Sequence, residues 1–302
     1  MHSIGLVLHP QRDSAEAVDA ILGWASRSGT AVYGINDELA RLRCAAIGVT
    51  PAQLAARCDL IVSLGGDGTM LRAMRLADGA ARAGDDGEPT PVLGVNLGKL
   101  GFLAEIDVPD LPDALAAIEK DDFTIEPRLA IDCSWKGGRE MGGATVTAFN
   151  DIATVRTPGD GGAAIAVRVN GESFVSYAAD AVIVATPTGS TAYSFSAGGP
   201  IVSPTVDALI VTPAAPHSAY NRGVVLSVQD TVSLHVLPDS GRLAVEVDGP
   251  VAGHVTAGDR LEISARLGAA RVIRLGLTTF YQRARRKLRI TDSAEIPVGR
   301  VG

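Results

Sequence analysis

Residues 65–69 combine three glycines with one carboxylate, in the order Gly-Gly-Asp-Gly-Thr. Glycine adopts backbone dihedral angles that other residues avoid, so such a loop lets the backbone approach a bulky anionic group. A carboxylate repels phosphate, so phosphate binding alone does not explain Asp67 in the loop. Its presence makes sense if Asp67 contacts a hydroxyl that attacks a phosphate. The loop therefore predicts phosphoryl transfer rather than nucleotide binding alone.

A second polar stretch follows the apolar residues 181–185. Thr188, Ser190 and Thr191 offer hydroxyl donors and acceptors suited to a base or a ribose, and the ring of Tyr193 offers a face for stacking. The alternative interpretation is a turn rich in Ser and Thr that caps a helix. These residues alone leave both interpretations open.

The pair Asn150-Asp151 interrupts an otherwise apolar region. An Asn side chain carries both donors and acceptors for an adenine edge, and a neighbouring carboxylate can accept two ribose hydroxyls. A simple turn containing Asn and Asp is the alternative.

Charge and histidine spacing limit the possible partners. The net charge of −7 argues against nonspecific nucleic-acid binding. The one basic run, residues 283–289, is interpreted either as a solvated helix or strand edge, or as a basic patch near a phosphate site. The five histidines show no spacing typical of zinc, so we predict no metal site on the protein's own side chains.

The elements around the loop predict a parallel sheet. Residues 60–64 form an apolar strand before the glycines, and Met70, Leu71 and Met74 suggest a helix face after them. Further strands are expected at 3–9, 31–35 and 91–96, with a helix near 110–120. This alternation indicates a Rossmann-like α/β domain, whose ligands bind beyond the carboxyl ends of the strands. Asp67 falls at such an end.

From about residue 125 the apolar residues alternate with a period of two. Asn170-Gly171 is a strong hairpin signal, and a second alternating pair of segments flanks residues 238–241. We therefore predict a β-sandwich-like second domain. The expected division is an α/β domain at 1–125 and a β-rich domain at 126–280, with a tail at about 281–302 packing back on the first domain.

Nothing in the sequence indicates a membrane or secretion. No apolar run reaches the ~20 residues of a membrane-spanning helix, and the first residues lack a basic signal-peptide start. The expected location is the cytoplasm.

Four motifs together resemble the NAD kinase family: residues 65–69, 96–103, 150–151 and 187–193. They occur in the family's order and spacing, over most of the chain. A glycine-Asp-glycine loop alone is weak evidence for this family, because 6-phosphofructokinases and diacylglycerol kinases have a similar loop. The long Thr/Ser/Gly motif at 187–193, combined with the glycine motif at 96–103, is specific.

The resemblance implies transfer of the terminal phosphate of ATP or polyphosphate to the 2′-hydroxyl of the adenosine ribose of NAD, giving NADP. Asp67 would be the proton acceptor or orienter of that hydroxyl. The donor phosphates would lie near Gly65, Gly66, Gly68 and Thr69, with Arg72 neutralising charge. The remaining substrate-binding residues implied for the β-rich, NAD-binding domain are Asn150, Asp151, Asp180, Thr188, Thr191, Ala192, Tyr193 and Ser196. Of these, Asn150 and Thr191 would hold the adenine with Tyr193 stacking nearby, Asp151 would bind ribose hydroxyls, and Asp180 would lie near the nicotinamide.

The resemblance also implies a magnesium ion carried largely by ATP and water, and a homodimer or homotetramer built through the β domain. Three positions depart from the family pattern: Asp151 stands where Glu is usual, Ala181 where Gly is common, and Ala178 where a basic residue is frequent. These departures motivate one alternative, a catalytically weak dinucleotide-binding regulatory protein. A lipid or sugar kinase sharing the glycine loop is the other alternative.

Overall fold

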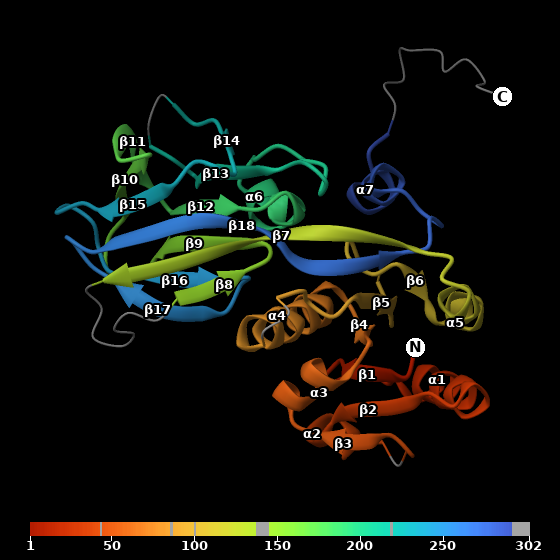
Figure 1. Ribbon diagram of the computed structural model, residues 1–302. Helices are drawn as coiled ribbons and strands as arrows, with labels where there is room; N and C mark the ends of the chain where they lie inside the picture. Colours follow the sequence, from red (N-terminus) through yellow and green to blue (C-terminus); the bar gives the residue numbers. More distant parts are fainter. Residues whose placement is uncertain (43, 85–86, 100, 137–144, 218–219, 292–302) are drawn as a thin grey trace, which may run out of the picture.

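The computed structural model describes residues 1–42, 44–84, 87–99, 101–136, 145–217 and 220–291, and Figure 1 shows their arrangement. Leu100 of the second glycine motif and residues 292–302 of the predicted tail lie outside the described residues. The N-terminal α/β half and the β-rich half lie side by side (Figure 1).

The N-terminal half contains a parallel sheet in the order β5-β4-β1-β2-β3, and β6 pairs with the outer side of β5. The strand bounds are β1 (Ser3–Leu8), β2 (Ala31–Ile35), β3 (Ile47–Val49), β4 (Leu60–Gly65), β5 (Val92–Asn96) and β6 (Ile106–Asp107). Every residue of β1, β4 and β5 is buried, as expected for parallel strands with both faces covered.

Helices cover both faces of this sheet. The helix bounds in this half are α1 (Ala15–Ser28), α2 (Asn36–Leu39), α3 (Pro51–Arg57), α4 (Asp67–Ala83) and α5 (Leu111–Glu119), with a short 3-10 turn η1 (Val108–Asp110). Leu6 and Val62 pack in one apolar cluster with residues of α1 and α5. Val7 and Ile61, the sequence neighbours of Leu6 and Val62, pack in another cluster with α3 and α4. The alternation follows from successive side chains pointing to opposite faces of a strand.

The β-rich half is a sandwich of antiparallel strands. Its six-stranded sheet has the order β14-β13-β12-β9-β16-β17, and it packs on the antiparallel part of the larger sheet, β11-β10-β15-β18 with β7 and β8. The bounds are β7 (Thr124–Lys136), β8 (Thr145–Ala148), β9 (Asp151–Arg156), β10 (Ala163–Val169), β11 (Glu172–Ala179), β12 (Ala181–Ala185), β13 (Ala208–Ala214), β14 (Val224–Ser227), β15 (Val232–Val236), β16 (Leu243–Val247), β17 (Val251–Val255) and β18 (Arg260–Arg274). Short helical turns η2 (Thr188–Thr191) and α6 (Tyr193–Ser196) follow β12, and α7 (Phe280–Leu288) follows β18.

Strand β18 belongs to both halves. Its first residues pair with β15, through register pairs such as Val232 with Ile263. Near its end Val272 pairs in parallel with Val92 of β5, so that the two halves share one twelve-stranded sheet. Ala270 and Val272 accordingly lie in the apolar cluster of α3 and α4.

The predicted fold class is confirmed: a Rossmann-like parallel sheet is joined to a β-sandwich-like half. The sequence did not indicate that the last strand returns to the parallel sheet. In the part of the chain that the structure describes, no helix combines the length and apolar character needed to cross a bilayer.

Candidate active site

The loop at residues 65–69 connects β4 to α4 at the carboxyl end of the parallel sheet. Gly66 is the N-cap of α4, and its carbonyl accepts the N–H groups of Thr69 and Met70 at 3.0 and 3.1 Å. A Cβ at Gly65 would lie 2.2 Å from the Thr69 hydroxyl, so only glycine fits this turn. The N-terminus of a long helix, with its free N–H groups, thus opens beside Asp67.

The Asp67 carboxylate is held by the second glycine motif. Its Oδ1 accepts the N–H groups of Phe102 and Leu103, each at 3.0 Å, and its Oδ2 lies 3.0 Å from the Phe102 nitrogen. A Cβ at Gly101 would lie only 2.2 Å from Oδ1, so glycine allows the backbone to approach the carboxylate. The two glycine motifs therefore build one site around Asp67.

A hollow of about 420 Å³ adjoins the loop. Its lining combines loop residues with basic groups: His9, Pro10, Arg12, Gly66, Asp67, Gly68, Thr69, Arg72 and Arg75. Arg72 also binds Glu38 and the Leu8 carbonyl, each at 2.7 Å. Burial, and then the charges of Arg12, Arg41 and Arg72, lower the pKa of His9, as expected where cations gather.

Arg12 is a residue that the sequence analysis missed. Its Nη1 is buried and has no hydrogen-bond partner among the residues that the structure describes. The same nitrogen would lie 2.6 Å from a Cβ at Gly98 and 3.9 Å from one at Gly66. Arg12 therefore reaches between the two glycine motifs, with a donor left for a ligand. A lone arginine at position 12 gave no signal of this in the sequence.

The structure brings the Asn150-Asp151 pair together with the turn at 187–193. The Thr186 hydroxyl donates to the Phe149 carbonyl at 2.5 Å, and the Thr186 N–H donates to the Asn150 carbonyl at 2.8 Å. A Cβ at Gly189 would lie 2.0 Å from the Asn150 carbonyl oxygen. Glycine at this position thus permits the close contact of the two motifs.

Within the turn, the two interpretations apply to different residues. Thr188 and Ser190 are buried, with Thr188 Oγ1 accepting from Arg128 at 3.2 Å and Ser190 Oγ donating to the Pro187 carbonyl at 2.7 Å. These hydroxyls support the turn itself. The other residues predicted to bind ligand are more accessible. Partly buried side chains are those of Thr191, Ala192 and Tyr193, and Ser196 is exposed.

Acidic side chains surround Tyr193. Burial, and then the charges of Asp248 and Glu246, raise the pKa of Asp151 to about 7. The backbone N–H of Tyr193 stabilises the carboxylate and opposes part of this rise. Burial and the charges of Glu246, Asp151 and Asp180 raise the pKa of the Tyr193 hydroxyl. Asp180 itself is half-exposed and pairs with Arg156 at 2.5 Å. Asp151, Asp180 and Tyr193 therefore share one electrostatic environment.

Asp248, which the sequence analysis also missed, holds the backbone of this region. Its buried carboxylate accepts the N–H groups of Phe149, Asn150 and Asp151 at 3.1, 2.7 and 3.2 Å. Its Oδ2 also pairs with Arg75 of α4 at 2.8 Å. One carboxylate thus joins the Asn150-Asp151 pair to the helix that begins at Asp67.

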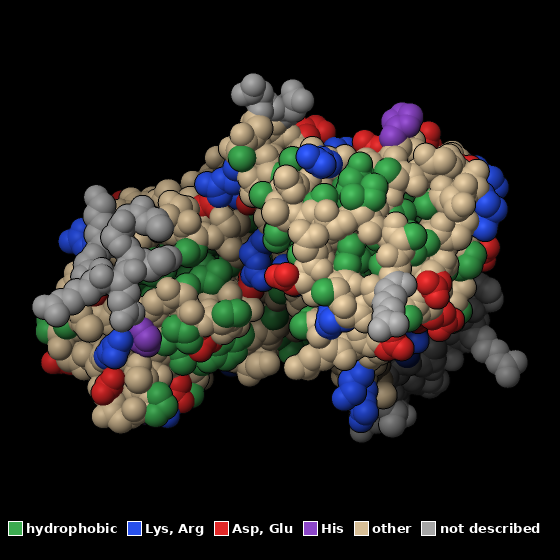
Figure 2. All heavy atoms as spheres, turned by 90° about the horizontal axis from the view of Figure 1, so that it is seen from below, with side chains coloured by type: hydrophobic (Ala, Val, Ile, Leu, Met, Phe, Trp, Pro, Cys, Tyr) green, Lys and Arg blue, Asp and Glu red, His purple; other side chains and the backbone are tan. Residues whose placement is uncertain are grey.

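Basic side chains gather where the two lobes of the molecule meet on the face shown in Figure 2. On the C-terminal side of the site, α7 adds the predicted basic run. Arg285, Arg286 and Arg289 are exposed, in line with the solvated-helix interpretation, whereas Arg283 is buried. Lys287 Nζ lies 3.0 Å from Asp67 Oδ2, so the run also reaches the loop.

Both halves of the chain match models of one protein family. The ATP-NAD kinase N-terminal domain matches residues 4–123, and the ATP-NAD kinase C-terminal domain matches residues 149–275. The NAD kinase of Desulforamulus reducens is 38% identical over 291 residues, covering 96% of this chain and 98% of the relative. NAD kinase 1 of Streptomyces avermitilis is 38% identical over 325 residues, covering 96% of this chain and 88% of the relative.

Two solved structures have the same fold. Yeast NADH kinase complexed with NADH superposes with a TM-score of 0.83 at 24% identity, covering 98% of this chain and 90% of the yeast chain. An NAD kinase from Archaeoglobus fulgidus in complex with ATP superposes with a TM-score of 0.72 at 25% identity, covering 95% of this chain and 98% of the archaeal chain.

Proposed function

Because the chain belongs to the ATP-NAD kinase family, we propose that it transfers the terminal phosphate of ATP to the 2′-hydroxyl of the adenosine ribose of NAD, producing NADP. The observation that carries the proposal is the Asp67 carboxylate, held by two backbone N–H groups beside a helix N-terminus and a cation-lined hollow. This arrangement suits a hydroxyl that attacks a phosphate.

Asp67 acts on the attacking hydroxyl. Phosphoryl transfer depends mainly on positioning and charge neutralisation, and a carboxylate orients the hydroxyl and accepts its proton. The contacts of Phe102 and Leu103 fix the carboxylate in one orientation, which supports this role.

The donor phosphates bind beside the loop. The backbone at the start of α4 lies close to the phosphates and offers them N–H groups; the residues concerned are Gly65, Gly66, Gly68 and Thr69. Arg12 contributes a guanidinium nitrogen that has no partner within the described ranges, and we add it to the phosphate-binding set. Arg72 contributes charge from a position fixed by Glu38. ATP is the proposed donor, and polyphosphate is the second to be tested.

The adenosine part of NAD binds where the two β-domain motifs meet. Asn150 and Thr191 hold the adenine, Tyr193 stacks nearby, and Asp151 accepts ribose hydroxyls. Asp180 acts toward the nicotinamide end. Thr188 and Ala192 shape the pocket wall, and Ser196 lies at its edge. The close contact between Gly189 and Asn150 supports this grouping.

Magnesium enters with ATP. In the described residues, no group of three or more His, Cys, Asp or Glu side chains is arranged to hold a metal ion. Asp67 is surrounded by N–H donors and an ammonium group, which fit an anion better than a cation. These surroundings fit a Mg²⁺ ion whose ligands come mainly from the nucleotide phosphates and water, as is common for this ion.

We propose a division into an α/β domain at 1–125 and a β-rich NAD-binding domain at 126–280, with α7 packed on the first. A homodimer or homotetramer built through the β domain is also proposed. Phe174 and Tyr220, which pack edge to face, and Val225 are exposed large apolar residues of that domain, which supports such an interface. The cytoplasmic location stays a prediction.

The test is formation of NADP from NAD and ATP with magnesium, read by a coupled dehydrogenase. Replacing Asp67 by Asn should lower kcat by about 10²- to 10⁴-fold, the usual contribution of a general base. Asp113→Asn, an exposed acid on α5, is the matched control and should leave kcat unchanged. Equal rates for Asp67→Asn and wild type would refute the assignment of Asp67. A wild-type protein that binds NAD tightly in calorimetry but makes no NADP would favour the regulatory binding protein.

A further inference from the structure

Helix α7 follows the last residue of the family match and has its own well-defined ends. Thr279 caps its N-terminus, exchanging hydrogen bonds with Gln282 at 3.2 and 2.9 Å. Arg289 ends the helix in the left-handed conformation, with φ 53°. These caps fix where the helix begins and ends, and therefore which side chains it directs toward the rest of the molecule.

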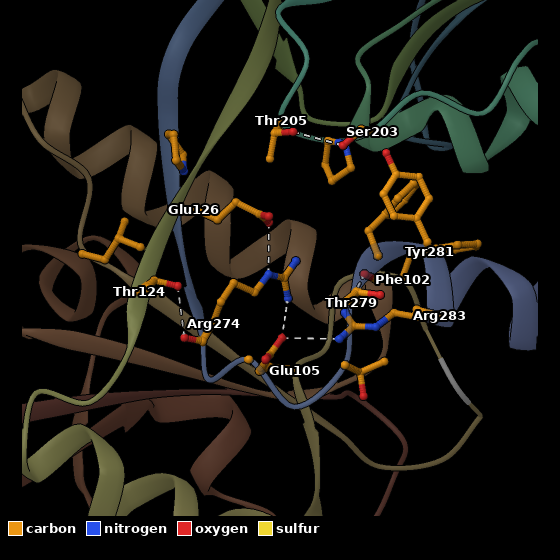
Figure 3. A pocket seen from close by; sticks show the side chains of 16 residues that line it. Phe102, Glu105, Thr124, Glu126, Ser203, Thr205, Arg274, Thr279, Tyr281 and Arg283 are labelled. Carbon is orange, nitrogen blue, oxygen red and sulfur yellow. Dashed lines mark hydrogen bonds and ion pairs between the residues drawn. The ribbon is translucent and has the colours of Figure 1, made fainter. Parts of the chain in front are cut away.

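A buried arginine anchors α7 to the segment that holds Asp67. Arg283 is 3% exposed, and its guanidinium donates to the Phe102 carbonyl at 2.9 Å and to Glu105 at 3.3 Å. Glu105 in turn binds Arg274 at 2.8 Å. Figure 3 shows this chain of ion pairs in a cleft of about 630 Å³, with Phe102 and Arg283 side by side.

One turn after this anchor, Lys287 reaches the catalytic carboxylate. Residues four apart lie on the same helix face, so the position of Arg283 determines that of Lys287. The Lys287 ammonium lies 3.0 Å from Asp67 Oδ2 and 4.4 Å from the centroid of the Phe102 ring. Phe102 thus contacts both partners: its N–H binds Asp67 and its ring lies under Lys287.

Stability does not explain this pairing. The side chains of Lys287 and Asp67 are 32% and 28% exposed, and ion pairs this accessible to water contribute little to folding. With Asp67 holding the attacking hydroxyl, as in the proposed function, the ammonium would instead stand next to the point where that hydroxyl meets the phosphate. Negative charge on the transferred group develops there, and a fixed cation stabilises it.

Building on the proposed function, we propose that Lys287 is a catalytic residue of the phosphoryl transfer. The bond from the ribose 2′-oxygen to the γ-phosphorus forms while the bond from that phosphorus to the bridging oxygen of ADP breaks. The hydroxyl proton passes to Asp67, and the electron pair of the broken bond leaves with ADP. Lys287 keeps its proton and contacts a non-bridging oxygen of the phosphoryl group during the transfer. When the ribose hydroxyl binds beside Asp67, the ammonium turns from Asp67 toward that oxygen.

The experiment compares Lys287→Met with Arg286→Met. Methionine keeps an apolar stem over Phe102 and removes only the charge, while Arg286 is an exposed cation one position earlier on the same helix. For Lys287→Met we expect kcat to fall by about 10²- to 10³-fold, as for loss of one transition-state donor. The KM for NAD should stay within about threefold of wild type, because the contact forms in the transition state. Arg286→Met should keep the wild-type kcat, and both variants should share one melting temperature.

Chemical rescue separates catalysis from structure. In Lys287→Ala, added ethylammonium should restore part of kcat in proportion to its concentration, and it should leave Arg286→Ala unaffected. Lys287→Arg should keep more activity than Lys287→Met. An unchanged kcat in Lys287→Met, an effect on KM alone, or no rescue would overturn the proposal. A rise in kcat would also overturn it, since the pair with Asp67 would then be inhibitory. Absence of NADP formation by the wild type would instead contradict the proposed function itself.

Discussion

Asp151 carries a carboxyl group whose surroundings oppose its charge. It is 4% exposed, and the neighbouring acids Asp248 and Glu246 add to the effect of burial. The sequence identified this residue through its place beside Asn150, and it predicted a ribose contact. It could not reveal the neighbouring acids, because residues nearly one hundred positions apart form the cluster. Arg12 was not predicted for the same reason: its role depends on its closeness to Gly66 and Gly98, which lie far along the chain.

The pKa of Asp151 predicts a pH dependence of NAD affinity. Only the ionised carboxylate accepts bonds from both ribose hydroxyls, and this form gains population as pH rises through about 7. We therefore expect the KM for NAD to fall between pH 6 and pH 8 in wild type, and to stay flat over that range in Asp151→Asn. Steady-state kinetics at saturating ATP provide the measurement, with Asp113→Asn as the control. A flat wild-type profile would contradict a ribose role for this carboxylate.

The same pKa predicts a stability difference. Between the ordinary value of 3.8 and the folded value of about 7, the folded protein retains a proton that the unfolded chain has lost. This group therefore lowers the free energy of unfolding as pH rises through that range. Asp151→Asn should gain stability relative to wild type from pH 4 to pH 7, measured by urea unfolding at each pH. A constant difference between the two proteins would show that Asp151 does not titrate in this way.

At the scale of elements, periodicity indicated which faces are buried but not which strands pair. The Asn170-Gly171 hairpin is confirmed, with φ of 52° and 80° and pairing of Val169 with Glu172. Such a turn determines its own register. The alternating segments around residues 238–241 are different: β15 pairs with β10 and β18, whereas β16 pairs with β9 and β17. Neighbours in the chain therefore lie in different sheets, because alternation fixes only the inward face.

The approach of residues 101–103 to the start of α4 predicts the effect of one methyl group. In Gly101→Ala the new Cβ would lie 2.2 Å from Asp67 Oδ1, so the carboxylate or the segment must move. Since misplacement by about 1 Å can cost about 10²-fold in rate, kcat should fall by roughly that factor. Gly79→Ala is the control: it lies in α4 with no atom within 4 Å of the new Cβ. This control should gain about 0.5–1 kcal/mol of stability at unchanged kcat. Equal kcat in both variants would contradict the role of the close approach.

For the whole molecule, ion pairs hold α4, which begins at Asp67, against the sandwich that carries the Asn150-Asp151 pair. Arg75 pairs with Asp248, and Arg266 of β18 pairs with Asp78 at 2.7 Å and with Asp132 of β7 at 2.9 Å. Asp78 and Arg266 are 188 positions apart. A single sequence gives the charges but not the pairing, so the two motifs could be predicted as parts of one site only through the family resemblance.

Asp248 predicts how strongly the halves depend on each other. Asp248→Ala would leave the N–H groups of Phe149, Asn150 and Asp151 without their acceptor, and an unsatisfied buried donor costs about 1–3 kcal/mol. We expect a loss of at least about 3 kcal/mol in the free energy of urea unfolding. Arg75→Met removes the partly exposed partner and should cost under about 1 kcal/mol. Equal losses in the two variants would mean that the ion pair, not the backbone contacts, gives Asp248 its importance.

The shared strand β18 has a consequence for synthesis on the ribosome. Residues 1–123 contain every strand that pairs with β5 except β18, and that strand ends at Arg274. Because β6 pairs only with Val95 and Asn96, the nascent N-terminal half emerges with the start of the β5 edge unpaired, and about 150 further residues must be translated before Val272 can pair with Val92. An edge left open for that long invites pairing with other chains. The order of translation thus makes the last strand the closing step, and truncation before it should leave an aggregation-prone fragment.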